Sequence, residues 1–180
     1  FSPDRQRLAT AGTDGTVRIW SIKAQTVERI LHWDQQPQTQ PGTAPPAITA
    51  LTFSPDGQQI AAIARKANFV QVWSVESGTV QHRFQNSGQL GNQLLYNSAG
   101  NWLAATSNGQ AVSLWRTDTG QRQQVVSSGG AIQQFDLSST TNRLLTVERE
   151  RLNLWEPGSH RPIKTLHAPV RLHSATLSPD

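Results

Sequence analysis

The side chains with catalytic or metal-binding potential are few, and their spacing builds no familiar site. The five histidines are scattered, and no two of them have the close spacing of a zinc-ligand pair. The chain contains no cysteine, which excludes thiolate metal sites, cysteine nucleophiles and disulfides. It also contains no Gly-x-Ser-x-Gly elbow and no phosphate-binding loop. We therefore predict no catalytic residue, no cofactor, no metal and no small-molecule substrate.

The charge of the chain is mildly basic and evenly spread. Sixteen basic and twelve acidic residues give a formal net charge of +4. A nucleic-acid site needs its basic residues gathered on one face, whereas the arginines are scattered along this sequence. The run from Glu148 to Arg151 alternates acidic and basic residues and is typical of a solvated loop between strands. A nucleic acid is therefore not the expected partner.

Length and composition indicate one globular domain or a piece of a larger one. The chain has 180 residues, of which 36% are hydrophobic, and its mean hydropathy is −0.49. No run of about 20 apolar residues could span a membrane, and no segment of the signal-peptide type opens the chain. We expect a cytoplasmic protein that does not bind membranes. Because the sequence has no methionine, we also expect it to be part of a longer protein.

Two markers recur along the chain in a fixed phase. Trp20, Trp73, Trp115 and Trp155 are separated by 53, 42 and 40 residues. Copies of the sequence Phe-Ser-Pro-Asp, some of them weak, precede each tryptophan, and one more copy ends the chain. Such self-similarity is the signature of a repeat architecture.

Within each repeat the hydrophobic period is two, which predicts strands. Apolar and polar residues alternate in residues 15–20, and a short strand of small apolar residues precedes them in residues 8–11. The dipeptides Asp14-Gly15, Asp56-Gly57 and Asn108-Gly109 are strong turn signals. Each repeat is therefore predicted to form four short antiparallel strands, which is the structure of one propeller blade. The fold class is predicted to be an all-β propeller made of such blades.

At these residues the chain resembles the WD-repeat (WD40) β-propeller family. Residues 1–20 are similar to the core motif of the family, and the resemblance covers the whole chain except residues 34–47. The later repeats are degenerate, because Ser21, Ser74, Arg116 and Glu156 stand where the family has Asp after the tryptophan. The resemblance implies rings of usually about seven blades. We therefore expect about four blades of an incomplete ring, with closure of a four-bladed ring as the alternative.

The resemblance also implies a buried hydrogen-bonded network in each blade, formed by His, Ser or Thr, Asp and the tryptophan. Only the first repeat keeps a plausible set, in Thr10, Asp14 and Trp20. The other repeats have Ala67, Gly109 and Arg149 at the position of Asp14 and are expected to depend on apolar packing. The tryptophans at the repeat position are predicted to be structural: Trp20, Trp73, Trp115 and Trp155.

The repeats set the expected organisation of the chain. The four units span roughly residues 1–47, 48–88, 89–130 and 131–169, and a lone innermost strand follows at 170–180. Residues 34–47 form a loop insert rich in Gln and Pro, whose composition cannot bury enough surface to order itself. We interpret the insert as a tolerated loop extension, with ordering on a partner as the alternative.

The function that the resemblance implies is a non-enzymatic scaffold for protein–protein interaction. Rigid blades with variable loops suit recognition, although a fold alone does not fix a function. One alternative is a propeller enzyme with its site in the central channel. The other is a nucleic-acid-binding propeller, whose binding would fall steeply with salt.

The loops between blades, and those between second and third strands, differ in every repeat, whereas the Ser-Pro-Asp turns are similar. Similar loops can hardly encode a specific partner, and Arg and Trp are enriched in binding hot spots. Trp33 lies outside the repeat phase, so it is either packed locally or exposed as a contact residue, and we expect its removal to cost little stability. We predict that a protein or peptide partner, which the sequence does not identify, docks through Trp33, Arg65, Lys66, Arg149 and Arg151.

Overall fold

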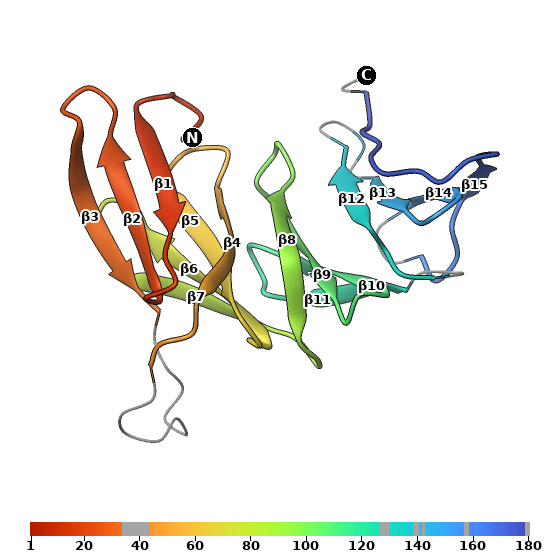
Figure 1. Ribbon diagram of the computed structural model, residues 1–180, viewed down its shortest axis with the longest axis horizontal. Coiled ribbons are helices and arrows are strands. Elements are labelled where there is room, and N and C mark those ends of the chain that lie inside the picture. Colours follow the sequence, from red (N-terminus) through yellow and green to blue (C-terminus); the bar gives the residue numbers. More distant parts are fainter. Residues whose placement is uncertain (34–43, 127–129, 139–140, 142, 157–158, 179–180) are drawn as a thin grey trace. The chain divides into compact units, whose positions relative to one another are not determined.

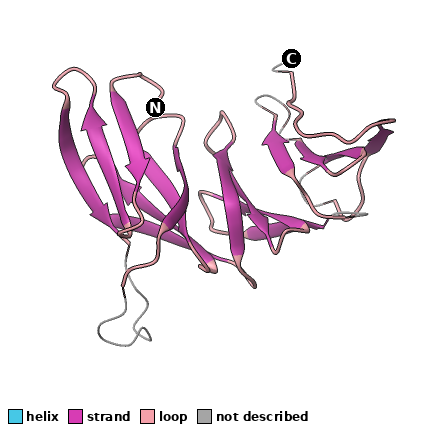
Figure 2. Ribbon diagram, in the orientation of Figure 1, coloured by secondary structure: helices cyan, strands magenta, loops and turns pink. Residues whose placement is uncertain are grey.

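The computed structural model is built of strands and turns throughout the residues that it describes, which are 1–33, 44–126, 130–138, 141, 143–156 and 159–178. No helix occurs among these residues (Figure 2), which confirms the predicted all-β class. The chain divides into two compact units, Phe1–Gln85 and Asn86–Asp180. Most of the insert predicted at residues 34–47 lies outside the described residues.

Unit 1, Phe1–Gln85, contains two antiparallel sheets whose strands follow one another in sequence order (Figure 1). This is the meander that propeller blades show. The first sheet has the order β1-β2-β3 and the second has the order β4-β5-β6-β7. The strands are β1 (Arg7–Ala11), β2 (Thr16–Ser21), β3 (Thr26–His32), β4 (Ile48–Phe53), β5 (Gln59–Ala64), β6 (Phe69–Ser74) and β7 (Val80–Gln85).

Unit 2, Asn86–Asp180, contains two four-stranded sheets of the same kind. Their orders are β11-β10-β9-β8 and β12-β13-β14-β15, and every pairing is antiparallel. The strands are β8 (Leu90–Tyr96), β9 (Trp102–Ser107), β10 (Ala111–Arg116), β11 (Arg122–Val126), β12 (Gln134–Leu137), β13 (Leu144–Val147), β14 (Arg151–Trp155) and β15 (Lys164–His167).

The repeat tryptophans occupy one position in the four sheets. Each lies on the strand before the last of its sheet and is paired in register with an apolar residue of the preceding strand. Trp73, Trp115 and Trp155 are at most 1% exposed, whereas Trp20 is half-buried. The register pairs are Leu8 with Trp20, Ile60 with Trp73, Leu103 with Trp115 and Leu144 with Trp155.

Two of these tryptophans use their indole N–H in the same way. Trp20 Nε1 donates to Thr10 Oγ1 at 2.9 Å, and Trp155 Nε1 donates to Thr146 Oγ1 at 3.0 Å. The second pair is fully buried, which differs from the expectation that only the first repeat keeps such a set. Asp14 does not join the first pair, because its carboxylate accepts from Arg18 Nη2 at 2.6 Å and from Thr16 Oγ1 at 2.7 Å. These bonds hold the pKa of Asp14 far below its ordinary value.

Trp33 belongs to the core of unit 1, so it is packed locally and the alternative of an exposed contact residue is wrong. Its side chain is 7% exposed. The indole stacks on Phe69 with ring centroids 4.9 Å apart, and it meets Trp73 edge to face at 6.0 Å. Its backbone N–H donates to the carbonyl of Gly15 at 2.9 Å. Trp33 therefore fills the space between the two sheets of unit 1 at the end of β3.

The core of unit 2 also lies between its two sheets. Val112 and Leu114 of β10 are fully buried and belong to one apolar cluster with Phe135 of β12 and Leu144 of β13. Trp102, which the sequence places at the start of a strand, is 7% exposed and packs in this cluster. The alternating apolar residues of the strands therefore supply the packing between the sheets.

The Ser-Pro-Asp turns are closed by their own side chains. Ser54 Oγ donates to Asp56 Oδ1 at 2.6 Å, and the Gln59 N–H donates back to Ser54 Oγ at 2.9 Å. The same bonds recur in the first copy of the turn, between Ser2, Asp4 and Arg7. These bonds hold the turn at the head of each small-residue strand.

The segment after β15 differs from the expected innermost strand at 170–180. Its described residues, up to 178, have no strand assignment. Leu177 N–H donates to Asp136 Oδ2 at 2.8 Å, and Thr176 Oγ1 donates to the same oxygen at 2.6 Å. The segment is therefore held to β12 through the Asp136 side chain rather than through a backbone ladder.

We predict that Trp33→Ala lowers the free energy of unfolding by about 3–5 kcal/mol, as for other large buried aromatic residues. The reason is the loss of the ring contacts to Phe69 and Trp73. Urea unfolding followed by far-UV circular dichroism measures the effect. Ile22→Ala is the control, because Ile22 is 42% exposed and its loss should change stability little. Equal stability of the two variants would contradict the core position of Trp33.

The Ser54 hydroxyl and the Gln58 N–H hold the pKa of Asp56 below its ordinary value. A lowered pKa stabilises the fold fully above the ordinary value of about 3.9, and the gain is lost as the pH falls through the lower, folded value. We therefore expect Asp56→Asn to lower Tm at neutral pH, and expect this difference to shrink below about pH 4. A difference that stays constant down to pH 2 would show that the carboxylate charge is not involved.

Candidate functional site

The predicted contact residues of unit 1 lie on the turn between β5 and β6. Arg65 and Lys66 are exposed. The Arg65 N–H donates to the carbonyl of Ala47 at 2.8 Å, and the Ala67 N–H donates to that of Ala64 at 3.0 Å. Lys66 has a φ of 64°, so the turn is tight. The turn therefore presents two cations from a fixed backbone, while Trp33 of the same unit is buried and offers no surface.

The predicted contact residues of unit 2 lie on the corresponding turn, between β13 and β14. The Glu148 N–H donates to the carbonyl of Arg151 at 2.9 Å and closes the turn. Arg149 is exposed and Arg151 is half-buried. The predicted residues are thus divided between two turns of the same kind, one in each unit.

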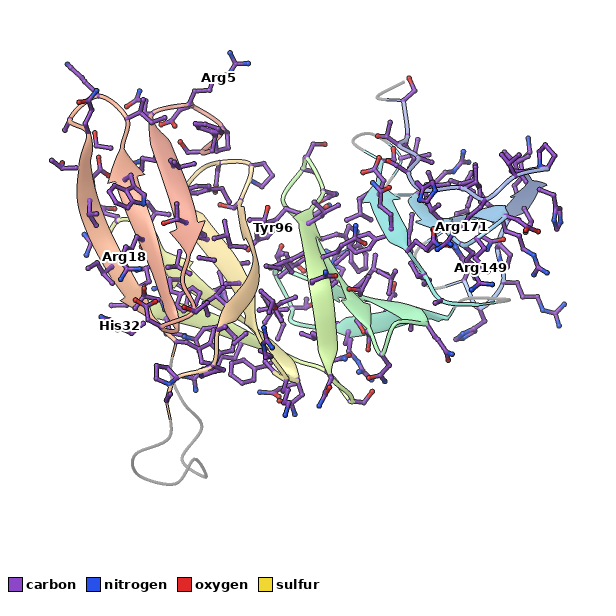
Figure 3. The ribbon with its side chains drawn as sticks, viewed as in Figure 1. Arg5, Arg18, His32, Tyr96, Arg149 and Arg171 are labelled. Atoms are coloured by element: carbon purple, nitrogen blue, oxygen red, sulfur yellow. The ribbon has the colours of Figure 1, made fainter. Side chains whose placement is uncertain are left out.

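A third arginine joins the turn of unit 2 from the segment that follows β15. The Ala168 N–H donates to the carbonyl of Glu150 at 2.9 Å, and the Leu172 N–H donates to that of Arg149 at 2.6 Å. These bonds attach the segment to the turn and bring Arg171 beside Arg149, as Figure 3 shows. Sequence reasoning missed Arg171, because it assigned residues 170–180 to an innermost strand.

These segments enclose a pocket, which we call the arginine pocket. Its volume is about 560 Å³. One wall is the segment before β12, which is held by a bond from the Gln133 N–H to the carbonyl of Val147 at 2.8 Å. The lining residues are Gly130, Ala131, Gln133, Glu148, Arg149, Glu150, Arg151 and Arg171.

The guanidinium groups of the arginine pocket have no partners among the described residues. Neither Arg149, Arg151 nor Arg171 forms a side-chain hydrogen bond or an ion pair there. Other arginines of unit 2 are paired: Arg116 with Asp118 at 2.5 Å, and Arg143 with Glu156 at 3.8 Å. The arginine pocket therefore offers positive charge that is available to a ligand.

A buried polar network supports the turn from within. Glu148 is 3% exposed, although the sequence suggested a solvated loop. Its Oε1 accepts from Asn153 Nδ2 at 2.7 Å, and Asn153 Oδ1 in turn accepts from Thr165 Oγ1 at 2.7 Å. These hydrogen bonds link the turn to β14 and β15, so the backbone that carries the arginines is held in place.

The described residues show no arrangement for metal chemistry. Among them, no three His, Asp or Glu side chains gather where they could hold an ion. Within the same ranges there is also no helix of the length and apolarity needed to cross a bilayer.

Comparison with known proteins finds one family match at the start of the chain and several similar proteins. Residues 1–21 match the family described as "WD domain, G-beta repeat". Protein HIR1 of Kluyveromyces lactis is 37% identical over 46% of this chain. Eukaryotic translation initiation factor 3 subunit I of Aspergillus terreus is 25% identical over 99% of it, and human Coronin-7 is 26% identical over 65%. The chain spans 10%, 54% and 12% of these relatives, respectively.

The buried network under the arginine pocket gives a stability test. We expect Glu148→Leu to lower the free energy of unfolding by about 1–3 kcal/mol, because Asn153 Nδ2 is left without its acceptor. Glu148→Gln is the matched control, since its amide oxygen can still accept that bond. Urea unfolding followed by circular dichroism compares the two variants. Equal losses would mean that the bond to Asn153 does not stabilise the fold.

Proposed function

We propose that this chain, which carries WD repeats, is a non-enzymatic scaffold whose protein partner docks on the turns between the second and third strands of its repeats. The observation that carries the proposal is the arginine pocket, in which three guanidinium groups without partners are gathered on a turn fixed by backbone hydrogen bonds. Free guanidinium groups on a rigid scaffold are typical of recognition surfaces.

The relatives support a role in assemblies. One of them is named as a subunit of a translation initiation factor. The similarity covers 99% of this chain and 54% of that relative. The repeats of such chains present variable loops on strands whose packing is repeated. We also propose that the protein is located in the cytoplasm.

Two turns supply the proposed contact residues. In unit 1 they are Arg65 and Lys66, which are exposed on the β5–β6 turn. In unit 2 they are Arg149 and Arg151 on the β13–β14 turn. The two turns occupy equivalent places in their repeats. Each presents cations at the end of its sheet where the two middle strands are joined. Trp33 is not part of the proposed surface, because its ring packs in the core.

Charge reversal tests the proposal. The tagged chain and its Arg149→Glu/Arg151→Glu variant are used to capture partners from a lysate of the source cells, and the captured proteins are compared by quantitative mass spectrometry. We expect the variant to lose a defined set of partners at least about tenfold, because each reversal places a repulsive charge in the contact.

The matched control is Arg143→Glu/Arg161→Glu, which makes the same charge change at the opposite ends of β13 and β14. This control should keep the partners. Loss of the partners only in the control would refute docking on the β13–β14 turn.

A further inference from the structure

We infer that the arginine pocket binds an acidic segment of the partner protein, whose Asp or Glu carboxylates pair with Arg149 and Arg171. This inference rests on the proposed scaffold function and adds the chemistry of the partner.

The distribution of unpaired arginines supports the inference. In unit 2, Arg116 and Arg143 have carboxylate partners, and Arg122 Nη1 donates to Asn86 and Ser87 at 2.9 Å. The remaining arginines have no side-chain partner among the described residues, and all of them except Arg161 line the arginine pocket: Arg149, Arg151 and Arg171. An excess of unpaired positive charge indicates a ligand of the opposite sign.

The chemistry of the side chains selects carboxylates. A guanidinium offers a planar fork of N–H donors that matches a carboxylate in a bidentate pair. The pocket contains no lysine, so every cation in its lining has this geometry. Its volume of about 560 Å³ lies in the range of ordinary ligand sites and can admit several side chains.

The acidic residues of the lining favour separate carboxylates over a dense polyanion. Glu148 and Glu150 line the same pocket as the three arginines, so the lining has an excess of only one positive charge. A phosphate dianion or a nucleic-acid backbone would bring its charge close to Glu150. Carboxylates spaced along a peptide can each pair with one guanidinium instead.

The pocket is organised before a ligand binds. Arg171 is positioned by the hydrogen bond from the Leu172 N–H to the carbonyl of Arg149. The turn itself is stabilised by the hydrogen bond from Asn153 Nδ2 to Glu148 Oε1. A binding site whose backbone is already fixed loses less conformational entropy when it binds a ligand. The side chains of Arg149 and Arg171 are exposed and are the parts that must order on the ligand.

Fluorescence anisotropy tests the inference with the purified 180-residue chain. The probe is a fluorescein-labelled peptide of alternating Glu and Gly. The comparison probes are the same peptide with Gln in place of Glu, the Gln peptide with one phosphoserine, and a labelled oligothymidylate. We expect the Glu peptide to bind most tightly. Its affinity should fall as NaCl rises from about 50 to about 300 mM, because salt screens charge pairs near the surface.

Variants locate the binding. Arg149→Gln/Arg171→Gln should weaken the Glu peptide about tenfold or more, and Arg149→Lys/Arg171→Lys should restore part of the loss. Arg143→Gln/Arg161→Gln removes the same charge elsewhere in unit 2 and should leave the affinity unchanged. Circular dichroism of each variant shows that the fold is intact. Equal binding of the Gln peptide, tighter binding of the phosphopeptide or oligothymidylate, or no effect of Arg149→Gln/Arg171→Gln would overturn the inference.

The two proposals can fail separately. If Arg149→Glu/Arg151→Glu loses its lysate partners but the Glu peptide does not bind, the scaffold function stands and the acidic ligand is wrong. If the Glu peptide binds at Arg149 and Arg171 but no lysate partner depends on the β13–β14 turn, the pocket takes acidic peptides while the proposed docking fails.

Discussion

The rest of the structure depends on the packing of one tryptophan in each sheet against the preceding strand, and in three of the four sheets this tryptophan is fully buried. In the second sheet Trp73 pairs in register with Ile60 of β5, and the residues of β5 from Ile60 to Ala64 are fully buried. A large aromatic side chain supplies much of the buried apolar area, while the small residues beside it let a second sheet approach. The strands fixed in this way set the position of every turn, including the turn that presents Arg149.

The polar residue two positions before each tryptophan shows how degenerate repeats keep one architecture. In three sheets this residue is fully buried, and a buried polar side chain needs a hydrogen-bond partner. The partners differ from sheet to sheet, and Gln71 Nε2 is buried without a partner among the described residues, so the repeats keep the fold without one conserved hydrogen bond. The pairs are Arg18 with Asp14, Gln71 with Arg83, Ser113 with Asn86, and Asn153 with Glu148 and Thr165.

In the last sheet this buried pairing and the candidate site share one turn. Glu148 turns inward to Asn153, whereas the next residue, Arg149, is exposed. The backbone of that turn also accepts the N–H groups of Ala168 and Leu172, which fixes the segment that carries Arg171. The backbone hydrogen bonds that stabilise the turn therefore also hold the segment that carries Arg171 beside Arg149.

The sequence by itself determined the class of fold, the strands of each repeat as far as β15 and the position of the repeat tryptophans, because these follow from local patterns: a period of two, turn dipeptides and a fixed spacing. It also pointed to Arg149 and Arg151, since their turn differs from the other repeats. Only the tertiary structure decided that Trp33 is buried against Phe69, that Glu148 points inward, and that Arg171 completes the arginine pocket. These facts depend on which distant segments pack or hydrogen-bond together, and no periodicity along the chain encodes such contacts.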